Sequence, residues 1–106
     1  MTKADIERQR DQFQKYSLTF KKLRLELEPM LPKIKNSSFD TYSIMIKPDL
    51  DKILYTLSDL EYQCSKIKED KIIKKYLQKE FNMLHNEWRE TKKIKQIIEE
   101  NIPKQV

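Results

Sequence analysis

Apolar residues recur in steps of three and four along the first third of the chain. This series consists of Ile6, Gln9, Phe13, Tyr16, Phe20, Leu23, Leu27, Met30 and Ile34. Such spacing puts one side chain per turn on the same face of an α-helix. Thr2 can cap the start of this helix, with Asp5 near the positive end of the helix dipole. Because Pro29 and Pro32 kink or end the last turns, we predict a helix over about residues 3–34.

A second series of the same spacing follows a short polar connection. It consists of Phe39, Tyr42, Ile46, Leu50, Ile53, Leu57, Leu60, Cys64 and Ile67. The connection, KNSSFD, is rich in residues that favour turns and caps, and Asp40 is the predicted N-cap. Pro48 either kinks this helix or marks its first turn, where proline fits well. We predict a second helix over about residues 41–68.

The third series is out of phase with the second. It consists of Ile73, Leu77, Phe81, Leu84, Trp88, Thr91, Ile98 and Ile102. The break at residues 68–71 is either a tight turn, with Asp70 capping the next helix, or a stammer within one long helix. At the other end, Asn101 is expected in the left-handed position that closes a helix, and Pro103 prevents its continuation. The third predicted helix spans about residues 71–101.

These series predict an all-α fold in a single domain, residues 1–106. If the chain turns near residues 68–71, three helices of similar length can pack side by side as an antiparallel three-helix bundle with short loops. If it does not turn, the product is a long two-helix hairpin or coiled coil that needs another chain to cover it. The sequence favours the closed bundle.

The composition excludes several classes of site and suggests a compartment. The 106-residue chain contains no glycine, so it cannot form the glycine-rich phosphate loops and nucleotide fingerprints that need this residue. Its single cysteine, Cys64, cannot form an internal disulfide. We find no apolar run long enough to span a bilayer, no secretory signal and no acid-poor targeting sequence. The predicted location is therefore intracellular, in the cytoplasm or nucleus, without insertion into a membrane.

Residues that could carry catalysis do not form a recognisable set. His85 is the only histidine, and its helical neighbours Phe81 and Arg89 are not metal ligands. Cys64 lies on the second series, where it is expected to act as a small core residue. We therefore predict no catalytic residues, no metal site, no cofactor and no enzymatic activity.

The charge pattern suggests one binding function. The net charge is +5, and the middle third of the chain is acidic while the outer thirds are basic. The lysines that could contact phosphates are Lys71, Lys75, Lys79, Lys92 and Lys93. A stripe of this kind could make the protein a basic, nucleic-acid-associated helical protein, although interspersed glutamates dilute it.

Apolar residues outside the three series suggest another function. Leu18 and Leu25 lie about 160° from the main apolar column of their helix, and a second stripe on the third helix is formed by Ile72, Tyr76 and Met83. Such surplus apolar positions are typical of partner surfaces. We predict a non-enzymatic interaction module, a small coiled-coil scaffold subunit that docks other helical subunits in a homo- or hetero-oligomer. A vesicle-tethering or fusion regulator would differ from this only in its partner.

Overall fold

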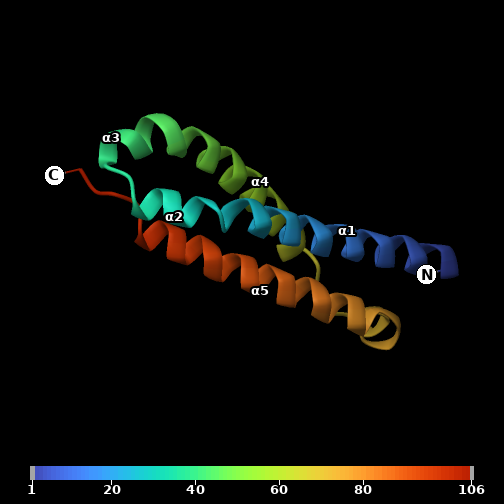
Figure 1. The fold of residues 1–106 in the computed structure, drawn as a ribbon. Coiled ribbons are helices and arrows are strands. Elements are labelled where there is room, and N and C mark those ends of the chain that lie inside the picture. Colours follow the sequence, from blue (N-terminus) through green and yellow to red (C-terminus); the bar gives the residue numbers. More distant parts are fainter. Residues whose placement is uncertain (1, 106) are drawn as a thin grey trace.

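The computed structural model describes residues 2–105, and these form an all-α three-helix bundle (Figure 1). The bundle measures 57 × 19 × 18 Å along its principal axes. The helical segments are α1 (Lys3–Leu27), α2 (Met30–Lys35), α3 (Phe39–Thr41), the π-helical turn η1 (Tyr42–Ile46), α4 (Lys47–Ser65), the π-helical turn η2 (Ile73–Leu77) and α5 (Gln78–Glu100). The predicted fold class is confirmed.

The three arms run up, down and up. α1 continues into α2, the segment from α3 to α4 runs back, and η2 with α5 runs again in the direction of α1 (Figure 1). Contacts across the bundle agree with this order. Tyr16 of α1 meets Gln63 near the end of α4, where the hydroxyl lies 3.1 Å from Oε1. Phe13 of α1 lies beside Phe81 of α5, and Phe20 lies beside Trp88 one heptad further along both helices. α1 and α5 are therefore parallel neighbours, and α4 is antiparallel to both (Figure 1).

The start and the end of α1 follow from the side chains at each end. The Thr2 hydroxyl accepts the N–H of Asp5 at 3.2 Å, and the Asp5 carboxylate accepts the N–H of Thr2 at 3.1 Å. This reciprocal capping box satisfies backbone donors that a helix start leaves open. At the far end, Pro29 and Pro32 lack the N–H groups that would bond the preceding turn. α1 therefore ends at Leu27, and one more helical segment, α2, extends the arm to Lys35.

The second arm starts at Phe39, before Pro48, so of the two alternatives for Pro48 the helix passes through it. Ser38, and not the predicted Asp40, is the N-cap, because its hydroxyl accepts the N–H of Thr41 at 3.2 Å. The helix then passes through Pro48 by way of η1, in which the N–H of Lys47 bonds the carbonyl of Tyr42 five residues back. A wider turn makes room for a proline ring that would clash in a regular helix.

Residues 68–71 were expected to form either a tight turn or part of one long helix, and the backbone shows the turn. The chain leaves the helix after α4, and residues 67–70 are not helical. The Asp70 carboxylate accepts the N–H of Ile73 at 2.8 Å and caps the next arm, as predicted. Half-buried Ile67 packs against the core and holds this connection to the bundle.

The end of α5 differs from the prediction. Asn101 has φ −108° and ψ 3°, so it is not left-handed, and its side-chain amide donates to the carbonyl of Ile97 at 2.7 Å. Within residues 2–105 no backbone has a positive φ. A chain without glycine closes its turns with hydroxyl, carboxylate and amide caps, because a left-handed turn would strain a residue with a Cβ atom.

The core follows the three apolar series. Its fully buried side chains include Phe13, Phe20, Leu27, Ile34, Leu50, Leu57, Cys64, Ile73, Leu77, Leu84 and Ile98. Phe20 stacks on Trp88, with ring centroids 5.8 Å apart, and the indole N–H donates to Glu61 of α4 at 2.8 Å. One aromatic pair and one hydrogen bond thus tie all three arms together at mid-height.

Candidate docking surface

A groove lies between α1 and α5 on the side of the bundle away from α4. Its volume is about 330 Å³, and its lining residues are Gln14, Ser17, Leu18, Lys21, Met83 and Glu87. Leu18 comes from α1 and Met83 from α5, so two residues that are distant in the sequence share one groove. We call this surface the α1–α5 groove.

Ser17 and Glu87, the least exposed residues that line the α1–α5 groove, form its floor. Buried Ser17 donates to the carbonyl of Phe13 at 3.0 Å, and buried Thr91 lies with its hydroxyl 3.2 Å from the carbonyl of Phe20. Small residues at this contact let the two helices approach closely. The Arg24 guanidinium lies 2.8 Å from a carboxylate oxygen of Glu87. Since this pair is largely withdrawn from water, it fixes how the two helices are aligned.

A second ion pair joins the same helices nearer their start. The Arg10 guanidinium lies 3.2 Å from the Glu80 carboxylate, donates to the carbonyl of Tyr76 at 3.3 Å and also bonds Glu7. Arg10 therefore links α1 to η2, where the backbone widens into a π-helical turn. The charges of Glu80 and Glu87 are both matched by arginines of α1.

Four of the five residues predicted to bind a partner are exposed. The side chains of Leu18 and Leu25 are 66% and 59% exposed, those of Tyr76 and Met83 are 46% and 50% exposed, and Ile72 is half-buried. The groove brings Leu18 and Met83 together directly. Leu25 lies seven residues after Leu18, about 10 Å further along the same side of α1. Tyr76 precedes Met83 in the π-helical turn η2, where the regular helical period is broken, and neither Leu25 nor Tyr76 lines the groove.

The lysines expected to contact phosphates in a nucleic-acid-binding protein lie apart from one another. Lys71, Lys75 and Lys79 are exposed at the start of the third arm, while Lys92 and Lys93 lie about 20 Å further along α5. Lys93 is paired with Glu90 at 3.1 Å, and the Lys75 ammonium lies 5.1 Å from the Tyr76 ring centroid. The structure therefore presents two lysine groups on one helix instead of one continuous patch.

The outer face of α4 and η1 carries exposed apolar residues that the sequence analysis did not single out. They are Ile44, Met45, Tyr55 and Tyr62. Tyr55 and Tyr62 are seven residues apart and outside the second series, which is the same signal that identified Leu18 and Leu25. We call this surface the α4 outer face.

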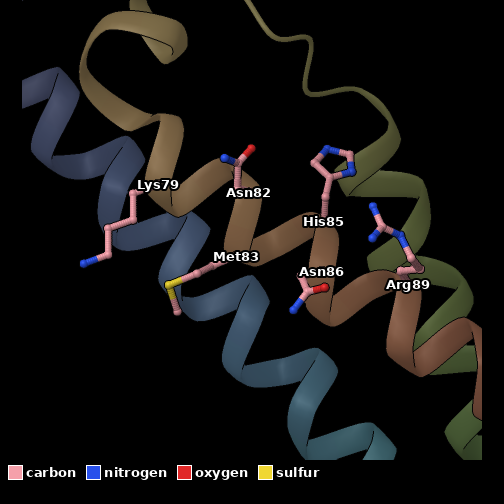
Figure 2. Close-up of a pocket in the computed structure, with 6 residues that line it drawn as sticks. All are labelled: Lys79, Asn82, Met83, His85, Asn86 and Arg89. Atoms are coloured by element: carbon pink, nitrogen blue, oxygen red, sulfur yellow. The ribbon is translucent and has the colours of Figure 1, made fainter.

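A broader hollow follows the outer side of α5. Its volume is about 510 Å³, and Figure 2 shows its lining residues, Lys79, Asn82, Met83, His85, Asn86 and Arg89. Lys79 and Met83 point toward α1, whereas His85 and Arg89 point toward α4 (Figure 2). The side chains spread apart along one helix instead of converging on a point. His85 is half-buried, with its ring centroid 4.4 Å from that of Phe81 and 5.6 Å from that of Trp88.

Cys64 is a core residue of α4, with 1% of its surface exposed. Burial, with a smaller contribution from the negative charge of Glu61, raises the pKa of this thiol to about 11. The thiol is therefore protonated at neutral pH and contributes to packing.

Among residues 2–105, no three His, Cys, Asp or Glu side chains form a cluster that could hold a metal ion. In the same part of the chain, no helix has the length and apolar character needed to cross a bilayer. No protein-family model, curated protein or solved structure matches the chain.

Proposed function

We propose that the chain is a non-enzymatic helical interaction module, a small subunit of a multiprotein assembly, and that it docks a partner helix in the α1–α5 groove. The observation that carries this proposal is the meeting of Leu18 and Met83 across one groove. Two parallel helices with an apolar groove between them offer the surface on which an amphipathic helix buries its apolar side.

Leu25 extends this surface along α1 beyond the groove itself, seven residues after Leu18. This interval matches the spacing of contacts along a docked helix. Because these side chains are outside the core, covering them removes apolar surface from water without disturbing the bundle. A partner helix would take the place of a fourth helix of the bundle.

Nucleic-acid binding is the competing proposal, and its support is weaker. The lysines that would contact phosphates are in two groups about 20 Å apart along α5, and one of them is paired with Glu90. A vesicle-tethering or fusion role would use the same groove with a different partner.

The proposal is tested with one double variant and one matched double variant as its control. The Leu18→Glu/Leu25→Glu variant places one charge in the groove and one two turns further along α1, while keeping good helix formers on exposed positions. The Tyr55→Glu/Tyr62→Glu variant does the same on the α4 outer face, where the side chains are 78% and 61% exposed. Partners are purified from cells with the tagged wild-type chain, then expressed and titrated against the three proteins.

We expect the groove variant to bind its partner at least about 100-fold more weakly, because two leucine side chains lose their burial. The control variant should bind like the wild type, and circular dichroism should show equal helicity for all three. Equal binding by the groove variant and the wild type would disprove docking in the groove.

A further inference from the structure

We infer that the occupant of the α1–α5 groove is an amphipathic helix of another protein whose apolar stripe is flanked by Asp and Glu. This inference rests on the proposed function and adds the chemistry of the partner. It is carried by the charges along the two edges of the groove.

One lysine flanks the groove on each helix. Lys21 of α1 lines the groove itself. Lys79 of α5, with Glu80, lines a smaller pocket of about 140 Å³ that adjoins the groove and shares Met83 with it. Within residues 2–105, neither lysine lies in an ion pair. Their positive charges are therefore available to a ligand.

The two carboxylates that line the groove and the adjoining pocket are already matched. Glu80 lines the pocket and faces Arg10 at 3.2 Å, and Glu87 lines the groove and faces Arg24 at 2.8 Å. The middle of the groove thus has an apolar strip between two cationic edges. A helix laid along this strip places the residues beside its own apolar stripe opposite Lys21 and Lys79, as the flanking positions do in paired helices. Glutamate or aspartate at those positions satisfies the lysines, and lysine or arginine does not.

The same charges argue against the other two occupants. A second copy of this chain, docked through the same face, would offer Lys21 and Lys79 only lysines and the already paired Glu80 and Glu87, so it could not satisfy their charges. A nucleic acid would satisfy the lysines but would leave Leu18 and Met83 without an apolar partner. An acidic amphipathic helix is the one occupant of the three that matches both the strip and its edges.

The experiment uses the full chain and two synthetic peptides of 21 residues, a length of about 30 Å when helical. Both carry leucines in positions i, i+3, i+4 and i+7, with flanking positions that are all Glu in one peptide and all Lys in the other. Binding is measured by fluorescence anisotropy at low and high salt. The edge variant is Lys21→Glu/Lys79→Glu, and the control with equal net charge is Lys71→Glu/Lys92→Glu, which changes lysines away from the groove.

The expected result has three parts. The Glu peptide should bind the wild type about tenfold more tightly than the Lys peptide at low salt, and salt should reduce this preference. The edge variant should reverse the preference, whereas the control variant should keep it. Circular dichroism should show the same helicity for all proteins.

Each other outcome overturns the inference in a distinguishable way. If both peptides bind equally and the Leu18→Glu/Leu25→Glu variant binds neither, docking in the groove stands but the acidic partner is wrong. If neither peptide binds, both proposals are wrong. If a 20-nucleotide single strand binds more tightly than the Glu peptide and the edge variant loses it, the lysines contact phosphates. If light scattering shows that the wild type dimerises and the Leu18→Glu/Leu25→Glu variant does not, the groove holds a second copy.

Discussion

The α1–α5 groove and the α4 outer face both expose apolar side chains, but they differ in shape. Tyr55 and Tyr62 on the α4 outer face are more exposed than Met83, which lines the groove. However, the α4 outer face belongs to one convex helix, while the groove has a wall on each side. A helix in the groove touches two helices at once and buries more apolar surface for each residue it contributes. Exposure alone therefore does not identify a docking surface.

The two surfaces also differ in how they interact with water. Each tyrosine of the α4 outer face has a hydroxyl that water can hydrate, and the Lys66 ammonium lies 4.3 Å from the ring centroid of Tyr62. Leu18 and Met83 have no strong hydrogen-bonding atom in their side chains. Covering them with an apolar partner costs little desolvation of polar groups, which favours the groove as the surface that binds.

The largest expected effect is on stability, and it compares a core residue beneath the groove with an exposed residue that lines it. Phe20→Ala removes a fully buried ring that stacks on Trp88, and we expect it to lower the free energy of unfolding by about 3–5 kcal/mol. Leu18→Ala, two residues earlier on the same helix, should change it by less than about 0.5 kcal/mol. Urea unfolding followed by circular dichroism measures both. A similar large loss for both variants would mean that Leu18 is part of the core and that the groove is not a free surface.

The next effect compares the inner and outer sides of α4. Because the pKa of the Cys64 thiol is raised from 9.0 to about 11, its thiolate fraction at pH 8 is about 100-fold below that of an ordinary thiol. Ellman's reagent should therefore modify native Cys64 at least about 100-fold more slowly than a cysteine at position 62, introduced as Tyr62→Cys in a Cys64→Ala background. Equal rates would show that the two sides of α4 are equally accessible.

The same thiol predicts a pH dependence of stability. A raised pKa in the folded state means that folding favours the neutral thiol. This contribution is complete below about pH 9 and is lost as the pH rises toward about 11. The free energy of unfolding should therefore fall more steeply over this range in the wild type than in Cys64→Ala. Parallel pH profiles would contradict the raised pKa.

The smallest expected effect compares two glutamates of α5. Glu87→Gln removes the charge that Arg24 meets in the floor of the groove, and we expect a loss of about 1 kcal/mol in unfolding free energy. Glu90→Gln removes a glutamate from the exposed pair with Lys93 and should cost less than about 0.5 kcal/mol. Thermal melts at matched pH give both values. An equal cost for the two variants would mean that the floor pair does not align α1 with α5.

Much of the fold follows from local patterns. The period of the apolar residues predicted all three arms, and the Thr2 and Asp70 caps were visible because a cap depends on residues only a few positions away. The errors were also local. Asp40 gave way to Ser38 as a cap, and Asn101 closed its helix without a left-handed backbone. Several polar residues at a helix end can each satisfy the same backbone groups, so the pattern alone does not choose among them.

Which side of each helix faces inward follows from the spacing of its apolar residues, because an α-helix repeats every 3.6 residues whatever surrounds it. The same spacing marks Leu18, Leu25, Tyr76 and Met83 as surplus apolar residues. That Leu18 and Met83 share a groove, with Lys21 beside them and Lys79 in the adjoining pocket, depends instead on tertiary packing. The relative rotation and offset of α1 and α5 produce that meeting. They depend on how Phe20 packs on Trp88 and on where Arg24 meets Glu87, contacts between residues more than 60 positions apart that no local period encodes.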